Sequence, residues 1–356
     1  MAFYYTIWFI ISIFSMSYSS KPEAKFIFII FLVFLCLMTG FRYEVGGDWE
    51  NYLNIYDYFK GVDNIAEALT ITEPGYALLN YFSQVLNFNN IMFVNAICSI
   101  FFYSFFYKFS KKVENYWVPI LVAFPYLILV VSMGYTRQSV AIAFVSFAVL
   151  YGLEKNIVKF FIFSLLAILF HKSAIIVFMF LPLLLNLKYF SSTWFFSFYS
   201  LFSFLIMSGL VYYSSLSGDN IYTNQNSEVS SAGAIFRVVV HFLALFFYVL
   251  YRKKIVNNFN NYRIFDYMSL LIIFVFLLAI PFSTLADRFN LYLIIFDILV
   301  FSYLFSNISV NSRKIMVLTV IFFNSLMLYI WLNFGAWSHA WLPYQNYLLR
   351  YILESI

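Results

Sequence analysis

The sequence predicts an all-α, polytopic integral membrane protein, and its composition and the spacing of its apolar stretches carry that prediction. Of the 356 residues, 63% are hydrophobic and only 10% are charged, and the mean hydropathy is +0.85. A water-soluble chain of this length has no core large enough to hide so much apolar surface, so lipid is the expected solvent. We expect residues 1–356 to form a single transmembrane domain.

A window of ~20 residues, the length of helix that crosses a bilayer core, places about twelve spans along the chain. They lie near residues 2–18, 26–40, 91–108, 116–133, 137–152, 157–170, 173–187, 193–213, 236–251, 267–283, 287–305 and 314–333. The first stretch lacks the basic start and small-residue cleavage site of a signal peptide, so we expect a retained span. Several stretches are shorter than ~17 residues and are expected to extend, tilt or re-enter.

The basic residues predict the orientation. Most of the 21 lysines and arginines fall in one set of connections, which should therefore be cytoplasmic. The opposite, outer face holds Arg42, Lys60, Arg137, Lys172, Arg237, Arg288 and Arg350. Arginine dominates this outer set, as expected for binding phosphate or carboxylate, because a guanidinium is always charged and can donate two parallel hydrogen bonds.

Two outer loops follow from this topology. Residues 41–90 form the one substantial polar insertion, and its second part, Glu73 to Phe88, has Pro near a helix start and the pattern of an amphipathic helix on the membrane surface. Counting that part as a full span would reverse the charge assignment of every later loop, so we exclude it. Residues 214–235 form a second, small and polar loop, which could act as a lid or face sugars.

The densest polar motif is RYEVGGDWENY, which begins at Arg42. Its two glycines allow a tight backbone turn, and Asp48 can orient a hydroxyl or accept a proton. Trp49 and Tyr52 offer ring faces to sugars. The alternative is an interfacial aromatic belt with a solvated acid, but the combination of Arg, two Gly and Asp after a span favours a functional site.

Two further motifs place arginine at the outer start of a span. Arg137 and Gln138 open the fifth span, although a positive charge opposes the dipole at a helix N-terminus; an anion bound there would explain the choice. Arg288 follows Asp287 at the eleventh span, and Asp287 could also pair with Arg288 or cap the helix. The alternative for both arginines is a side chain that snorkels to lipid headgroups.

His171 and Asp297 are the remaining polar candidates. His171 lies between two short spans on the outer face, and its ordinary pKa near 6.5 suits a proton acceptor. Asp297 lies deep in the eleventh span, where we favour an interhelical hydrogen bond over a functional role. Cys36 and Cys98 lie in separate apolar stretches and predict neither a disulfide nor a zinc site. We expect no metal, no cofactor and no nucleic-acid partner.

The segments RYEVGGDWENY, EPGYALLN, TRQSVAIA, HKSA and DRFNLY, in that order between about residues 40 and 292, resemble the EpsG-type branch of the Wzy polysaccharide polymerases. The resemblance implies a glycosyltransferase of the bacterial inner membrane, with a GT-C-like helix arrangement compatible with it. Such an enzyme acts at the periplasmic leaflet and makes O-antigen, capsule or exopolysaccharide. It moves a growing glycan from undecaprenyl diphosphate to the non-reducing end of a lipid-linked repeat unit.

This resemblance suggests roles for the candidate residues. Arg137 and Arg288, with Arg42 third, would stabilise the leaving diphosphate. Asp48 and His171 compete as the general base. The sugars would be positioned by Trp49, Tyr52 and Gln138, with Asp287 as a further substrate contact. Expected partners are the undecaprenyl-diphosphate-linked oligosaccharide, membrane lipid and a protein that regulates chain length.

Three alternatives remain at this stage. A lipid-linked oligosaccharide flippase should line a central cavity with charges at mid-depth on several helices, whereas here only Asp297 is clearly deep. A glycan O-acyltransferase should pair Arg with His on its first spans, but the first histidine is His171. A non-enzymatic scaffold would not require arginines at the outer ends of helices.

Overall fold

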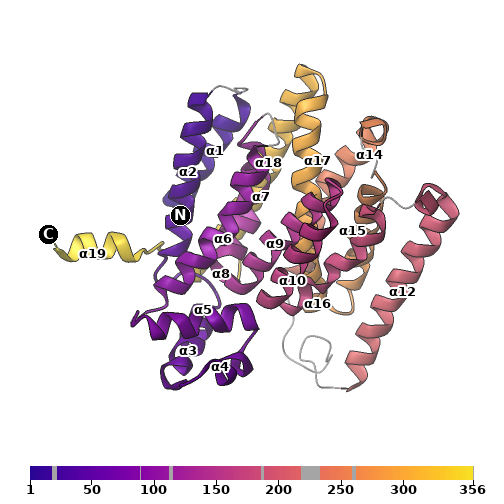
Figure 1. Ribbon diagram of the computed structural model, residues 1–356. Coiled ribbons are helices and arrows are strands. Elements are labelled where there is room, and N and C mark those ends of the chain that lie inside the picture. Colours follow the sequence, from indigo (N-terminus) through magenta and orange to yellow (C-terminus); the bar gives the residue numbers. More distant parts are fainter. Residues whose placement is uncertain are drawn as a thin grey trace. The chain divides into compact units, whose positions relative to one another are not determined.

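The computed structural model describes residues 1–17, 22–88, 90–111, 115–185, 188–217, 233–258 and 262–355, which form helices joined by short connections (Figure 1). Within these ranges the β-type pairing is limited to an isolated antiparallel bridge between Arg42 and Asn346. The all-α prediction is therefore confirmed for the described part of the chain.

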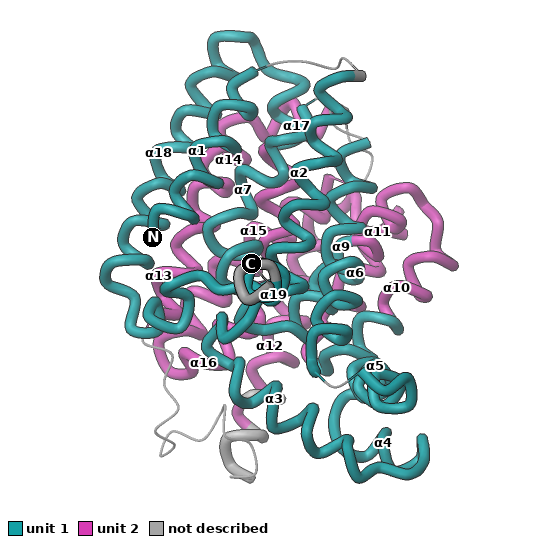
Figure 2. Tube along the Cα trace, turned by 90° about the vertical axis from the view of Figure 1, so that its left-hand side faces the viewer, with its two compact units in different colours: residues 1–146, 165–172, 302–356 teal, residues 147–164, 173–301 magenta. Residues whose placement is uncertain are grey.

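The chain divides into two compact units, each of which is described by itself (Figure 2). Unit 1 comprises residues 1–146, 165–172 and 302–356, and unit 2 comprises residues 147–164 and 173–301. The boundaries fall inside four helical elements: α9 (Thr136–Leu153), α10 (Ile157–Phe170), η3 (Lys172–Phe180) and α17 (Ile294–Asn307).

Unit 1 contains both ends of the described chain. Besides the first parts of α9 and the last parts of α10 and α17, its helices are α1 (Ala2–Met16), α2 (Pro22–Gly40), α3 (Trp49–Tyr58), η1 (Phe59–Gly61), α4 (Ile65–Ile71), α5 (Pro74–Val85), α6 (Met92–Ser110), α7 (Val118–Ala123), the π-helical η2 (Phe124–Val131), α8 (Ser132–Gly134), α18 (Val310–Phe334), η6 (Ser338–Trp341) and α19 (Tyr347–Ser355).

Unit 2 holds the middle of the chain. Its elements besides the shared helices are η3 (Lys172–Phe180, from Ser173 onward), α11 (Leu181–Leu184), η4 (Lys188–Ser191), α12 (Thr193–Ser217), α13 (Ala234–Val239), α14 (His241–Asn258), α15 (Arg263–Leu278), α16 (Ser283–Asn290) and η5 (Leu291–Leu293). The predicted loop 214–235 falls mostly on residues 218–232, which lie outside the described residues.

Helices α2 and α6 pack side by side and antiparallel in unit 1. The Ser99 hydroxyl of α6 donates to the Cys36 carbonyl of α2 (2.7 Å), and the Arg42 guanidinium just after α2 reaches Asn95 near the start of α6 (3.4 Å). The two ends of the insertion 41–90 therefore lie at the same end of the antiparallel pair α2 and α6. This agrees with the prediction that residues 73–88 do not cross the membrane.

The membrane prediction is supported at the level of a multi-pass protein. Each of the twelve predicted stretches coincides with helical residues, and in the described ranges six helices are long and apolar enough to cross a membrane. These six are Glu23–Gly40, Met92–Ser110, Thr136–Leu153, Ala234–Asn257, Ser283–Asn307 and Val310–Phe334. The other apolar helices are shorter, so a total of about twelve spans stays a prediction.

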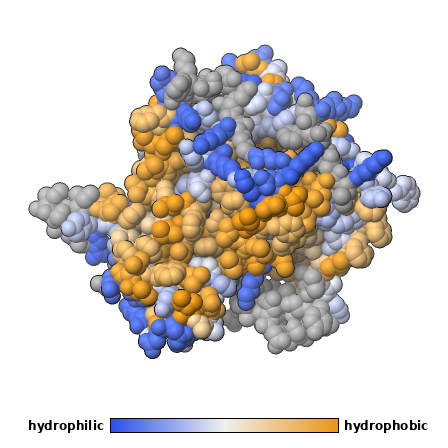
Figure 3. Space-filling model, in the orientation of Figure 1, coloured by the Kyte–Doolittle hydropathy of each residue, from blue (hydrophilic) through white to orange (hydrophobic). Residues whose placement is uncertain are grey.

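Apolar side chains point outward from these helices, as a lipid-facing surface requires. Phe9 is 64% exposed, Ile30 54% and Phe322 72%. Hydrophobic residues cover broad areas of the face shown in Figure 3. In water such a surface would favour aggregation, whereas in a bilayer it is matched by the acyl chains.

The insertion 41–90 folds into three short helices rather than the single one predicted. Helix α5 lies in the segment predicted as an amphipathic surface helix: Tyr76, Asn80 and Ser83 are buried, while Phe82 and Val85 are exposed. Its place on the membrane surface stays a prediction. A helix of 12 residues is about 18 Å long and cannot cross a hydrocarbon core of about 30 Å.

Candidate active site

The tight turn in the RYEVGG segment sets the positions of Asp48 and of the start of α3. Gly46 has φ of 115°, its N–H donates to the Ala340 carbonyl (2.9 Å), and a Cβ there would lie 2.3 Å from the Met133 carbonyl oxygen. Only glycine fits this close approach and this left-handed conformation. The turn places Asp48 at the residue before α3, which then begins at Trp49.

Arg42 is hydrogen-bonded by groups of the protein itself, a setting that was not predicted. Its side chain is buried (1% exposed), and its nitrogens donate to protein groups from α2, the RYEVGG turn, α6 and α9. The acceptors are the Thr39 carbonyl (2.8 Å), the Val45 carbonyl (3.2 Å), the Asn95 side chain (3.4 Å) and the Thr136 hydroxyl (2.7 Å). This guanidinium therefore joins the ends of α2, α6 and α9, and a substrate contact by Arg42 stays a prediction.

Arg137 lies at the second residue of α9, as predicted, and its surroundings are acidic and aromatic. Its Nη1 donates to Glu73 Oε2 (2.5 Å) and to the Thr72 hydroxyl (2.7 Å). The guanidinium carbon lies 5.6 Å from the ring centroid of Tyr52 and 5.8 Å from that of Tyr76. Its buried Nε has no hydrogen-bond partner among the described residues.

The Glu73 carboxyl beside Arg137 has a lowered pKa and is negatively charged. Burial by itself would raise the pKa of the Glu73 carboxyl, but the Arg137 charge, hydrogen bonds from its own backbone N–H and from Thr72, and the nearby His171 together lower that pKa. The carboxyl is therefore ionised at neutral pH. His171 follows α10, whose last turn packs directly on α5: a Cβ on Gly75 would lie 2.9 Å from the Phe170 ring.

The aromatic residues of the cluster are covered rather than open. Trp49 is 5% exposed and Tyr52 3%, and Tyr52 packs edge-on against Tyr76 with ring centroids 5.7 Å apart. Burial raises the pKa of both tyrosines, so both hydroxyls are neutral. The rings pack beside Arg42 and Arg137, and sugar binding by Trp49 and Tyr52 stays a prediction.

Asp48 and Gln138 lie within the same end of unit 1. Asp48 is partly buried before α3 and acts electrostatically on Tyr52, which raises the pKa of that tyrosine. Gln138 is buried (1% exposed) in the first turn of α9. Four of the five sequence segments, from RYEVGGDWENY to HKSA, thus supply residues to one cluster in unit 1. We call this group the Arg137 cluster; it consists of Tyr52, Glu73, Tyr76, Arg137 and His171.

The fifth segment lies in unit 2. Asp287 of α16 accepts a hydrogen bond from Arg237 Nε of α13 (2.6 Å), a partner that was not predicted, and pairing with Arg288 stays a prediction. Arg288 is half-buried in the same helix. Asp297 meets His241 Nδ1 (2.6 Å), and both are buried, which confirms an interhelical hydrogen bond for Asp297 with a partner that was not predicted.

Comparison with known families decides the affiliation. Residues 25–346 match a family model described as EpsG family, which is nearly the whole chain. The chain belongs to the EpsG family. The EpsG family is a Wzy-type polymerase family, and the predicted resemblance is therefore confirmed. No curated protein and no solved structure matches the chain.

Glu73 is the member of the Arg137 cluster that sequence reasoning missed. Its signal was present in the segment EPGYALLN, where an acid immediately precedes a Pro that begins a helix. Its partner could not be found from sequence, since 63 residues separate it from Arg137. Among the described residues no three His, Cys, Asp or Glu side chains gather where they could hold a metal ion; a metal-free reaction stays a prediction.

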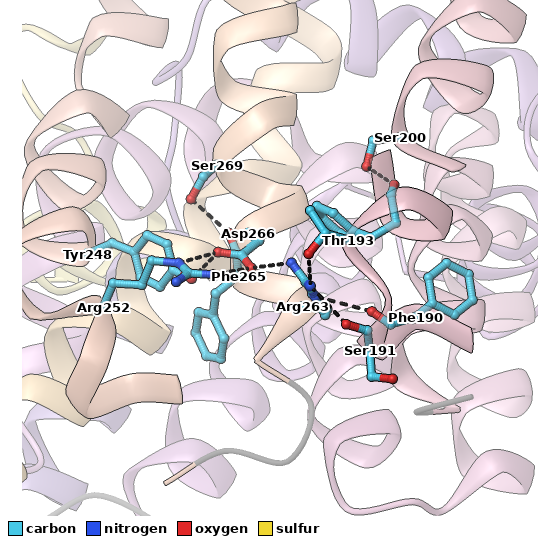
Figure 4. A network of polar contacts seen from close by, with 11 residues as sticks. Phe190, Ser191, Thr193, Ser200, Tyr248, Arg252, Arg263, Phe265, Asp266 and Ser269 are labelled. Carbon is cyan, nitrogen blue, oxygen red and sulfur yellow. Dashed lines mark hydrogen bonds and ion pairs between the residues drawn. The ribbon is translucent and has the colours of Figure 1, made fainter. Parts of the chain in front are cut away.

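A second polar cluster lies in unit 2 and is centred on Asp266 at the start of α15 (Figure 4). The carboxylate accepts two hydrogen bonds from Arg252 (2.7 and 2.8 Å), one from the Tyr248 hydroxyl (2.7 Å) and one from Arg263 (3.4 Å). Arg263 also donates to the Phe190 carbonyl (3.1 Å). This Asp266 cluster joins η4, α14 and α15 and was not predicted.

Proposed function

We propose that this EpsG-family protein polymerises lipid-linked glycan repeat units. It transfers a growing glycan from undecaprenyl diphosphate to the non-reducing end of a lipid-linked repeat unit, at the periplasmic face of the bacterial inner membrane. The observation that carries the proposal is Arg137: its guanidinium lies at the start of a candidate span, Nη1 donates to a carboxylate, and the buried Nε has no partner among the described residues.

The chemistry of the transfer explains why such an arginine is needed. The acceptor hydroxyl oxygen forms a bond to the anomeric carbon of the donor glycan. The bond from that carbon to the diphosphate oxygen breaks, and the electron pair leaves with undecaprenyl diphosphate. A fixed guanidinium in a site of low dielectric stabilises this negative charge in the transition state.

The remaining roles follow from positions in the Arg137 cluster. Arg137 contacts the diphosphate, and Asp48 and His171 are the predicted candidates for taking the proton of the acceptor hydroxyl. Gln138, Trp49 and Tyr52 position the sugars, and Tyr52 also lies beside the Arg137 guanidinium. Arg288, together with Asp287, belongs to unit 2 and is a separate proposal for a second anion contact, based on its half-buried place in α16.

The direct test is a surface-glycan gel. In a host with the gene deleted, wild type should restore a ladder of chain lengths, while Arg137→Ala should leave a single repeat unit on the lipid core. Arg252→Lys is the matched control, since that arginine is bound to Asp266 at a distance in sequence from every proposed site residue. Arg288→Ala is scored in the same gel for the second proposal.

Other outcomes identify the alternatives. Loss of all surface glycan in the deletion strain would indicate a flippase, because no repeat unit would reach the periplasm. A normal ladder with an altered acyl content would indicate an O-acyltransferase. Either result would overturn the polymerase proposal, as would a ladder unchanged by deletion of the gene.

A further inference from the structure

Among the described residues, Glu73 is the one carboxylate that bonds the Arg137 guanidinium, and the sequence prediction assigned it no role. Its side chain is 13% exposed. One oxygen, Oε2, accepts from Arg137 Nη1 (2.5 Å) and from the Thr72 hydroxyl (2.9 Å). It is the residue before α5, and the fixed start of that helix holds its backbone in place.

The groups around Glu73 come from four elements. Arg137 of α9 bonds it directly, Tyr52 of α3 and Tyr76 of α5 flank that arginine, and His171 after α10 acts on it electrostatically. The tyrosines are neutral, because burial raises their pKa. Arg137 therefore already carries an anionic partner, and a diphosphate that binds it has to compete with Glu73.

The diphosphate is expected to displace Glu73 from Arg137. A diphosphate carries more negative charge than a carboxylate and offers several acceptor oxygens to one guanidinium. When it takes Arg137, Glu73 loses the charge that keeps its proton affinity low, while its backbone stays fixed at the start of α5. A carboxylate released in this way lies next to the bound diphosphate and is a stronger base than before.

We propose, on the basis of the proposed polymerase function, that Glu73 is the general base of the transfer and that Arg137 restrains it until the lipid diphosphate displaces it. The Glu73 carboxylate takes the proton of the acceptor hydroxyl as the hydroxyl oxygen attacks the anomeric carbon. Undecaprenyl diphosphate leaves with the electron pair. Glu73 then gives its proton to the departing diphosphate and pairs with Arg137 again.

This mechanism couples the base to the presence of donor. Without a lipid diphosphate in place, Glu73 is held by Arg137 and cannot activate a hydroxyl, so water and free sugars are not activated either. Asp48 and His171 then act on the site through their charges, and neither needs to take the proton.

The test separates binding from turnover in purified full-length protein in lipid nanodiscs. Binding is measured with undecaprenyl diphosphate itself, and turnover with a lipid-linked repeat unit in single-turnover mode. For Glu73→Gln we expect several-fold tighter binding, because the competing charge is gone, and a rate lower by about 10²- to 10⁴-fold. Addition of formate should restore part of the rate to Glu73→Ala, because a small carboxylate can occupy the vacated space.

The matched control is Asp57→Asn, which removes an exposed carboxylate of the same insertion that forms an ion pair with the exposed Lys60. It should leave binding and rate unchanged. If Glu73→Gln does not fold, as judged by its melting temperature, Glu73→Asp replaces it. The shorter acid should bind undecaprenyl diphosphate as wild type does and transfer more slowly.

The inference is overturned if Glu73→Gln, or Glu73→Asp in its place, transfers glycan at the wild-type rate. It is also overturned if Glu73→Gln loses binding and rate together and formate restores nothing to Glu73→Ala, which would make Glu73 a positioning residue for Arg137. Failure of the polymerase proposal looks different: wild type itself would then form no glycosidic bond.

Discussion

The Arg137 cluster in unit 1 and the Asp266 cluster in unit 2 are both built around an arginine and a carboxylate, yet they differ in how fully their hydrogen-bonding groups are used. Asp266 accepts four hydrogen bonds, from Arg252, Arg263 and Tyr248. Arg137 has one carboxylate on one nitrogen and a buried Nε without a partner among the described residues. A saturated cluster stabilises a fold, whereas an unsaturated one can still bind something.

The burial of the two central pairs reinforces this contrast. Arg252 is 43% exposed and Asp266 10%, so water shares in that pair, whereas Arg137 is 23% exposed and Glu73 13%. An ion pair that water screens less interacts more strongly with an incoming anion. The Arg137 cluster therefore has an unused hydrogen-bond donor and is less screened by water. Both properties favour the proposed binding of a diphosphate.

The largest effect is expected when the Arg137 guanidinium is replaced by another cation. Arg137→Lys keeps the charge but removes the planar fork, so the transfer rate should fall by about 10²-fold or more, measured by single-turnover glycan transfer. Arg252→Lys should keep the wild-type rate. Equal rates for the two variants would remove the distinction between the clusters.

The next effect concerns stability rather than activity. Asp266→Asn leaves Arg252 and Arg263 without their shared negative charge, and the free energy of unfolding should fall by about 3 kcal/mol, less than for a fully buried pair because Arg252 is partly in water. Thermal unfolding in detergent measures this. Affinity for undecaprenyl diphosphate should stay unchanged; a lost affinity at intact stability would mean that the Asp266 cluster binds substrate.

A backbone change sharpens the comparison without touching a polar side chain. Gly46→Ala forces a Cβ to within 2.3 Å of the Met133 carbonyl oxygen at a φ of 115°, and should cost about 1–3 kcal/mol of stability together with activity. Gly47→Ala is the matched control, since its Cβ would meet nothing nearer than 3.7 Å. Equal melting temperatures for the two variants would contradict the close packing described for this turn.

The smallest effect is a dependence on pH. The pKa of Glu73 lies below its ordinary value of 4.5 in the folded protein, so its ion pair stabilises the fold above that value and the contribution is lost as pH falls through the folded-state pKa. The melting temperatures of wild type and Glu73→Gln should therefore differ by a constant amount from pH 8 to pH 5 and converge only below about pH 4.5. Convergence near pH 6 would instead assign the titration to His171.

Much of the fold was predictable because apolar helices are long and their composition is extreme. All twelve predicted stretches coincide with helical residues, and α5 has the predicted amphipathic pattern. Helices α3 and α4 were not predicted. Their segments alternate aromatic, acidic and small residues over few turns, and tertiary packing of residues such as Tyr56 and Ala68 decides their structure more than periodicity does.

The site was predictable in position but not in pairing. Arg137 was singled out because a positive charge at a helix start is unfavourable without an anion, and that argument uses local sequence alone. That argument does not apply to Arg42, which follows the end of α2, where a positive charge is favourable, so its predicted role depended on its motif alone. What distinguishes them is the set of acceptors at Thr39, Asn95 and Thr136, and those contacts exist only in the folded chain.

The acceptors of Arg42 have a consequence for genetics. Substitutions of Arg42 and of Arg137 would give the same colony phenotype, absence of long chains, through opposite causes: too little folded protein in the first case and an inert but abundant protein in the second. Growth at low temperature, or a stabilising second mutation elsewhere, should suppress only the Arg42 alleles. A saturation screen scored at two temperatures would thus sort the residues that build this protein from those that work in it.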